Sequence, residues 1–272
     1  MEVKKKWSVL ETQCFQGLRV SESTPLMKGG GAMYQYKLTF ALANNRLPLE
    51  MDRLLVSFLK SSARACSQHF YEKLYDKSRS VIKGYTYSCY LPGAKFHKDG
   101  IELAGQEFCL FFSDFDQMEL LSFFNGFQQM KYKEYPIAGN SMRLTSIRMQ
   151  QLREMKEEEI VIRMQSPLIV RRHDSERNTD TYYTCGMEGF ERTLKENTDF
   201  FIEKMSLPVS TEKFSIEMIK GKKVVIPVFG RNTDASLGIF KLTGSRQLLN
   251  ILLLSGLGSR RSEGHGKFEV VG

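Results

Sequence analysis

The sequence predicts an α+β protein built from two tandem ferredoxin-like (RRM-like) domains. Over residues 33–150, the spacing of apolar residues predicts the element order strand, helix, strand, strand, helix, strand, which is the order of a ferredoxin-like unit. A broadly similar order recurs over residues 158–272, without a residue-level repeat. The charged stretch at 152–159 has the composition of a linker. We therefore expect domains at 33–150 and 158–272, with residues 1–32 as an N-terminal extension or linker.

The elements of the first half follow from alternating and helical apolar periods. In chain order we predict a strand at 33–43, a helix from about 49 to 70, strands at 84–90 and 101–112, a helix from Asp114 to 127, and strands near 131–135 and 142–149. Asp114 is the predicted cap of the second helix, because its carboxylate can accept from free N–H groups there.

The second half is predicted on the same grounds. In chain order we expect a strand at 160–171, a polar loop at 171–178, a short strand at 182–183, a helix at 188–205, a hairpin of 214–218 and 222–229 around Gly221, a strand at 237–242, an apolar helix at 248–254, a glycine-rich loop at 256–266 and a final strand at 267–271.

Composition limits the function classes. The 272 residues are 42% hydrophobic, which is enough to fill real cores, and the net charge of +8 favours a polyanionic partner. The five cysteines are scattered and form no CxxC pair, which argues against a disulfide framework or a zinc site and for a reducing compartment. No signal peptide or membrane-length apolar run is present, so we expect a cytoplasmic protein without membrane contact.

The glycine-rich loop is the most informative stretch. Gly256, Gly258, Gly264 and Gly266 fall within eleven residues, where they permit positive φ and leave little side-chain bulk against a polyanion backbone. Arg260 and Arg261 lie between them, and consecutive N–H groups there can form an anion-binding nest. The loop differs from a P-loop because it follows a helix and lacks the Gly-Lys-[Ser/Thr] ending.

The loop resembles the glycine-rich signature near the C-terminus of the repeat-associated RNA-binding proteins of CRISPR systems. Within that superfamily the chain is most similar to the repeat-RNA endoribonucleases, the Cas-six (Cas6) family. Three further features of the second half carry the resemblance: the segment 166–171, the helical residues Phe190, Leu194 and Asn197, and the strand 238–242. The resemblance covers roughly residues 33–272 and also implies two ferredoxin-like domains.

The resemblance implies metal-independent cleavage of CRISPR repeat RNA, the precursor of guide RNA, without a cofactor. The ribose 2′-hydroxyl attacks the adjacent phosphate and leaves a 2′,3′-cyclic phosphate and a 5′-hydroxyl. Such a step needs a base, an acid and positive charge near the phosphate, which His, Tyr and Lys side chains can supply.

The catalytic residues that the resemblance implies are His69, Tyr75 and Lys83. His69 lies late in the first predicted helix, near the position of the family's histidine but not on it. Tyr75 stands where the family often has a histidine after leucine, and Lys83 matches the family's lysine. The alternative for His69 is a helix-edge histidine without a ligand.

The candidate RNA-binding residues lie in two places. Arg171 and Arg172 follow the strand that opens the second half, and their alternative is a solvated surface charge. The others belong to the glycine-rich loop, where His265 replaces an aromatic residue frequent in the family and is expected to stack on a base or line the groove. The loop candidates are Gly256, Gly258, Arg260, Arg261, Gly264, His265 and Gly266.

Two other functions stay open. The first is a non-catalytic RNA-binding subunit of a CRISPR effector complex, which the missing Leu-His pair favours and the lack of long insertions disfavours. A small-molecule enzyme of the same fold has no motif in its support. Contacts to effector-complex subunits and a homodimer are further alternatives that the resemblance leaves open.

Overall fold

The computed structural model describes residues 32–76, 78 and 81–272. Ala32–Gly272 form one compact unit. All but one residue of the predicted N-terminal extension at 1–32 lie outside the described residues. The domain limits 33–150 and 158–272 stay a prediction.

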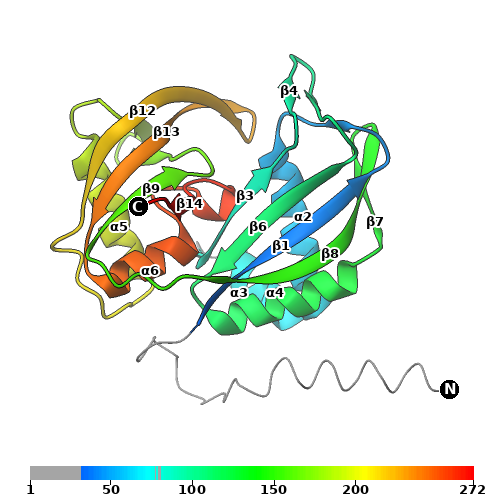
Figure 1. Ribbon diagram of the computed structural model, residues 1–272, viewed down its shortest axis with the longest axis horizontal. Helices are drawn as coiled ribbons and strands as arrows, with labels where there is room; N and C mark the ends of the chain where they lie inside the picture. Colours follow the sequence, from blue (N-terminus) through cyan, green and yellow to red (C-terminus); the bar gives the residue numbers. More distant parts are fainter. Residues whose placement is uncertain (1–31, 77, 79–80) are drawn as a thin grey trace. The chain divides into compact units, whose positions relative to one another are not determined.

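The first half contains an antiparallel five-stranded sheet, and its helices lie on one face of this sheet (Figure 1). The strand order is β3-β6-β1-β8-β7, and without the edge strand β7 it is the order of a ferredoxin-like unit. A small sheet of β2, β5 and β4 adjoins it. The elements are β1 (Met33–Leu42), β2 (Arg46–Leu47), α2 (Met51–Cys66), α3 (Gln68–Tyr75), β3 (Tyr85–Tyr90), β4 (Lys95–Phe96), β5 (Ile101–Glu102), β6 (Glu107–Asp114), α4 (Gln117–Met130), β7 (Glu134–Ile137) and β8 (Asn140–Leu152).

The core of the first half follows from the two apolar periods. Alternate residues of β1 are buried, and α2 turns a stripe of leucine and phenylalanine side chains towards them. Phe40 of β1 meets Phe58 of α2 edge to face, with ring centroids 5.1 Å apart, and stacks on Phe108 of β6 at 4.9 Å. These contacts fix which face of the sheet the helices cover.

The second half repeats this strand order. Its four-stranded sheet has the order β12-β13-β9-β14, and a separate hairpin of β10 and β11 precedes the first helix. The elements are β9 (Glu159–Met164), β10 (Val170–Asp174), β11 (Thr179–Tyr183), α5 (Phe190–Lys204), β12 (Ser215–Val228), β13 (Arg231–Thr243), α6 (Arg246–Ser255), the short 3₁₀ helix η1 (Arg261–Glu263) and β14 (Phe268–Val270). The predicted fold class, α+β with two tandem ferredoxin-like units, is therefore confirmed.

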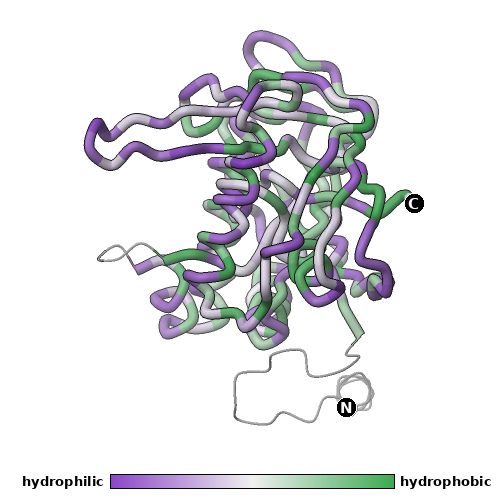
Figure 2. The backbone as a smooth tube through the Cα atoms, turned by 90° about the vertical axis from the view of Figure 1, so that its left-hand side faces the viewer, coloured by the Kyte–Doolittle hydropathy of each residue, from purple (hydrophilic) through white to green (hydrophobic). Residues whose placement is uncertain are grey.

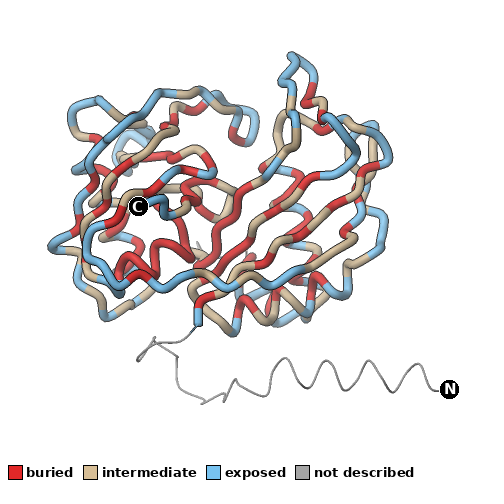
Figure 3. The backbone as a smooth tube through the Cα atoms, in the orientation of Figure 1, coloured by how far each residue is buried: buried red, intermediate tan, exposed pale blue. Residues whose placement is uncertain are grey.

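Helix α6 lies in the interior of the protein. Every residue from Leu248 to Ser255 is buried, so the helix is covered on all sides (Figure 3). Around this interior, the loops and hairpin ends at the periphery are mostly hydrophilic (Figure 2). No helix among the described residues is long and apolar enough to cross a membrane.

Two predicted features of the first half are wrong in detail. The first helix is interrupted at Ser67, whose extended backbone ends α2 and whose side chain accepts from the N–H of Phe70 to start α3. The cap of α4 is Asp116, which accepts from the N–H groups of Met118 and Glu119. Asp114 instead ends β6 as a buried residue.

Two predicted loops of the second half are strands. The polar stretch after 171 forms β10, paired with β11 in register from Val170 and Tyr183 onward. Gly221 lies inside β12 opposite Gly238, where a Cβ on Gly238 would come within 2.3 Å of the Lys220 carbonyl oxygen. These glycines allow two backbones to approach closely and do not mark a turn.

Candidate nucleic-acid interface

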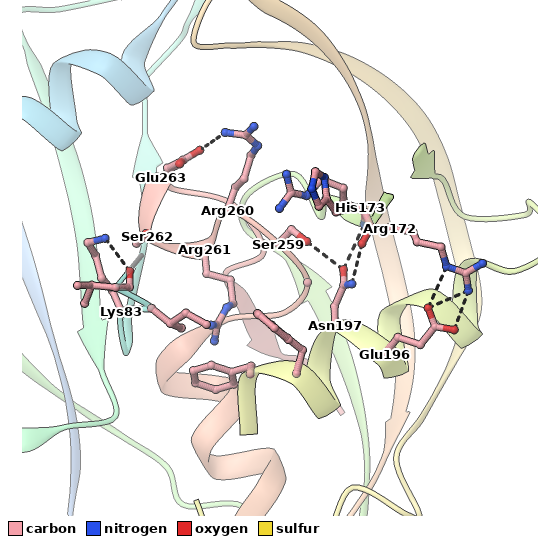
Figure 4. Close-up of a pocket in the computed structure, with 16 residues that line it drawn as sticks. Lys83, Arg172, His173, Glu196, Asn197, Ser259, Arg260, Arg261, Ser262 and Glu263 are labelled. Atoms are coloured by element: carbon pink, nitrogen blue, oxygen red, sulfur yellow. Dashed lines mark hydrogen bonds and ion pairs between the residues drawn. The ribbon is translucent and has the colours of Figure 1, made fainter. Parts of the chain in front are cut away.

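A cavity of about 600 Å³ brings together four segments that are distant in sequence. They are the approach to β3, strand β10, helix α5 and the glycine-rich loop (Figure 4). Its cationic side chains are Lys83, Arg171, Arg172, Arg260 and Arg261. The structure thus gathers the predicted arginines of both motifs, together with Lys83, around one hollow.

Carboxylates hold the more exposed arginines of this cavity in place. Arg172 donates from Nη2 to both carboxylate oxygens of Glu196, at 2.7 and 2.8 Å. Arg260 donates from Nη1 to Glu263 at 2.9 Å, and Figure 4 shows the two side chains pointing toward each other. Arg171 reaches Asp180 of β11 at 3.0 Å. An arriving phosphate can exchange with such partly exposed carboxylates, because it offers the same bidentate geometry.

Asn197 connects two walls of the cavity. Its side-chain amide donates to the carbonyl of Arg171 at 2.7 Å and its oxygen accepts from the Arg171 N–H at 3.2 Å. The same oxygen accepts from the hydroxyl of Ser259 in the glycine-rich loop at 3.0 Å (Figure 4). The sequence matched Asn197 to the family's helix, but no local pattern indicated this cross-link.

The glycines of the loop are required by packing within the protein. All four predicted glycines have positive φ, and an added Cβ would meet protein atoms at every one. At Gly258 the nearest atom is the carbonyl oxygen of Ile169 at 2.3 Å, and at Gly264 it is the Tyr87 ring at 2.4 Å. At Gly256 it is the Thr86 hydroxyl at 2.9 Å, and at Gly266 the carbonyl oxygen of the neighbouring loop segment at 1.9 Å. Their predicted approach to RNA stays a prediction.

Arg261 and His265, which the resemblance implies as RNA-binding residues, are both buried, although Arg261 also lines the first cavity, and their RNA-binding role stays a prediction. The Arg261 side chain lies under the loop, with Cζ 3.4 Å from the ring centroid of Phe201, and burial lowers its pKa to about 9. His265 is 7% exposed and lines neither of the cavities described here. Burial, together with nearby Arg260, lowers the pKa of His265 to about 4, so the ring is neutral at pH 7.

A buried lysine joins the two halves beneath the loop. Lys267 is 1% exposed and donates from Nζ to the hydroxyl of Ser113 in β6 at 2.7 Å. Ser113 in turn donates to the carbonyl of Leu254 in α6 at 2.8 Å. Burial lowers the pKa of Lys267 to about 7, because a charged ammonium is poorly solvated there. Sequence reasoning missed Lys267, since a single lysine after a glycine carries no signal.

This lysine predicts a rise of stability with pH. Between its folded pKa of about 7 and its unfolded pKa near 10.5, the unfolded chain binds one more proton than the folded chain. The free energy of unfolding should therefore increase across that window, by at most about 1.4 kcal/mol per pH unit. Urea unfolding at pH 7 and pH 9 measures it. The Lys267→Met protein should lack this part of the increase; an unchanged slope would contradict a buried, titrating Lys267.

A second cavity, of about 360 Å³, lies beside the first. Lys83 lines both, and in the second it meets Lys60, Tyr71, Tyr75 and Phe229. Lys83 Nζ is 5.2 Å from the Tyr75 ring centroid and donates to the carbonyl of Val81 at 3.2 Å. Burial, with a contribution from nearby Lys60, lowers the pKa of Lys83 against the opposing effect of Glu263.

Two of the three predicted catalytic residues meet in this second cavity. Tyr75 forms a hydroxyl–hydroxyl hydrogen bond of 2.7 Å with Tyr85, and burial raises the Tyr75 pKa well above its ordinary value. His69 lies on the exposed side of α3 and lines neither cavity. Among the described residues, no group of three or more His, Cys, Asp or Glu side chains is placed to hold a metal ion.

Comparisons with known proteins agree with this architecture. Residues 150–270 match the family described as CRISPR associated protein Cas6, C-terminal. No curated protein matches the chain. Among solved structures, the chain is similar to one described as a Cas6-related gene from Pyrococcus furiosus, with a TM-score of 0.77, 19% identity, and coverage of 89% of this chain and 99% of that chain.

Two further solved structures show the same fold. One is described as an RAMP protein binding different RNA substrates, with a TM-score of 0.76, 19% identity, and coverage of 88% of this chain and 100% of that chain. The other is described as CRISPR associated protein Cas6, with a TM-score of 0.70, 17% identity, and coverage of 89% of this chain and 100% of that chain.

Proposed function

We propose, on the premise that this chain belongs through residues 150–270 to the CRISPR-associated Cas6 family, that it binds CRISPR repeat RNA and cleaves it without a metal ion. The main support is that Lys83 lines both the arginine-lined cavity and the cavity that is lined by Tyr75. One strand of RNA passing through the first cavity would therefore present its backbone to Lys83.

Arginine side chains of the first cavity would hold the RNA backbone. Arg171, Arg172 and Arg260 are partly exposed, so phosphates can displace or bridge their present carboxylate partners. Arg261 stacks on Phe201 and so stabilises the glycine-rich loop that lines this cavity. Binding of this kind depends on charge and shape, so it should weaken as salt increases.

The proposed reaction is an internal transesterification. The 2′-oxygen forms a bond to phosphorus while the bond from phosphorus to the 5′-oxygen breaks. Lys83, whose lowered pKa enlarges its neutral fraction, takes the 2′-hydroxyl proton. Tyr75, whose raised pKa keeps its hydroxyl protonated, gives a proton to the leaving 5′-oxygen. The products are a 2′,3′-cyclic phosphate and a 5′-hydroxyl.

The alternative is a non-catalytic RNA-binding subunit, and the exposed position of His69 outside both cavities favours it. Incubation of the protein with repeat RNA in EDTA separates the two. Cleavage to a 2′,3′-cyclic phosphate, abolished by a 2′-deoxy nucleotide at the cut, supports the enzyme. Binding without cleavage supports the subunit, and cutting of the 2′-deoxy RNA would contradict the proposed reaction.

We further propose domain limits at 33–150 and 158–272 and a cytoplasmic location. A homodimer and contacts to subunits of an effector complex are alternatives that this function leaves open.

A further inference from the structure

The turn that joins β12 to β13 contains an unusual residue. Val228 pairs with Arg231, so Phe229 and Gly230 form a two-residue turn, with φ of 47° and 82°. Two positive φ values are typical of a type I′ turn, whose first position favours Asn, Asp or Gly. A bulky side chain there costs about 1–2 kcal/mol. Such strain persists where the surroundings hold it, and it clusters at functional sites.

This strained turn is fixed against the first half of the protein. The N–H of Phe229 donates to Oδ2 of Asp52 at 3.0 Å, and Asp52 is a buried residue in the first turn of α2. The guanidinium of Arg53 lies 5.9 Å from the centre of the Phe229 ring. Strands β12 and β13 curve over toward the first half to make this contact (Figure 1). The hydrogen bond to Asp52 therefore fixes the backbone of the turn against α2.

The anchored ring forms part of the second cavity. Phe229 keeps 38% of its surface exposed and lines the same hollow as Lys60, Tyr71, Tyr75 and Lys83. An exposed aromatic face beside ammonium groups is the arrangement that single-stranded RNA-binding sites use, because a base stacks on the ring while the cations meet its phosphates. A buried structural role would not need an exposed ring at a strained position.

We infer that Phe229 stacks on one nucleobase of the bound RNA and thereby positions that nucleotide beside Lys83 and Tyr75. This role rests on the proposed function. The ring does not touch the reacting atoms, so Phe229 is a substrate-positioning residue. Its contribution should appear as affinity for one nucleotide, whereas the arginines of the first cavity contribute to every phosphate they meet.

The test uses Phe229→Asn, because asparagine suits the type I′ turn while it removes the ring. We expect repeat RNA to bind about 5- to 100-fold more weakly, as base–aromatic stacking predicts. The thermal midpoint should stay unchanged or rise, since strain is relieved. Phe229→Tyr should restore affinity. Tyr132→Asn is the matched control: Tyr132 also has positive φ, at 65°, and 64% exposure, but lines neither cavity.

A series of repeat RNAs, each with one abasic nucleotide, identifies the stacked base. At one position, the abasic nucleotide should lower the RNA affinity of the unchanged protein. The same abasic nucleotide should not lower the RNA affinity of Phe229→Asn any further, because the stacking contact is already lost. Equal RNA affinity of Phe229→Asn and the unchanged protein would overturn the inference and leave the proposed function standing. The same conclusion would follow if, at every position of the RNA, the loss of affinity from the abasic nucleotide added to the loss from Phe229→Asn. Failure of the unchanged protein to bind repeat RNA would overturn both.

Discussion

Replacement of Lys83 by alanine is expected to slow single-turnover cleavage of repeat RNA by about 10²- to 10⁴-fold, the usual contribution of a positioned acid or base. Binding should fall much less, because the arginines of the first cavity remain. The expectation rests on a partly buried ammonium group that lines both cavities and has a lowered pKa. Quenched-flow or manual single-turnover assays at saturating protein measure the chemical step separately from binding.

Two variants show whether proton transfer is the cause. Lys83→Arg keeps the positive charge but cannot lose its proton near neutral pH, so it should be nearly as slow as Lys83→Ala. In the unchanged protein the rate should increase with pH up to the lowered pKa of Lys83, since only neutral Lys83 accepts a proton. A fully active Lys83→Arg protein would restrict Lys83 to an electrostatic role.

His69→Ala decides between the sequence prediction and the position in the structure. The sequence resemblance predicts that loss of His69 slows cleavage. Because its side chain is exposed on α3 and lines neither cavity, we expect an unchanged rate. A large loss in His69→Ala, with Lys83→Ala unaffected, would return the proton-transfer role to His69.

Gly266→Ala is expected to destabilise the fold by roughly 2–6 kcal/mol, the sum of a left-handed backbone penalty and overpacking. Gly266 has φ of 74°, and an added Cβ would come within 1.9 Å of the carbonyl oxygen of Leu257. That oxygen belongs to rigid backbone, and the Gly266 carbonyl also accepts from the N–H of Leu257. Chemical denaturation measures the change in the free energy of unfolding.

Two other glycines separate the contributions. Gly186 has φ of 89° with no atom within 4 Å of an added Cβ, so Gly186→Ala should show the backbone penalty alone, about 1–2 kcal/mol. Gly105 has neither feature, and Gly105→Ala should be close to neutral. If Gly266→Ala were no worse than Gly186→Ala, the loop would be able to shift, and its packing would not require glycine.

The fold was predictable because apolar period and element order are local properties. The alternation in β1 and the stripe on α2 can be read from neighbouring residues, and together they fix layers and strand order. Predictions failed where one residue type has two uses. Gly221 was interpreted as a turn residue, yet its role is close approach to Gly238 across β12 and β13. Only pairing between distant strands distinguishes the two uses.

The candidate site was predictable in part. The two arginine pairs were predictable as binding candidates because each lies beside a motif, and the structure brings them to one cavity. The burial of Arg261 and His265 was not predictable. Both are typical surface residues in a glycine-rich loop, but this loop packs against β3. Phe229 was missed for the opposite reason, since an aromatic at the end of a strand suggests core.

Each cavity draws its lining from both ferredoxin-like halves, and Lys267 with Ser113 joins the halves under the loop. A ligand bound in either cavity would therefore contact both halves and stabilise their association. Because binding free energies are coupled reciprocally, a tighter association of the halves also increases the affinity for the ligand. Substitutions in the buried interface between the halves, far from any phosphate, would then lower the affinity for the ligand by weakening that association.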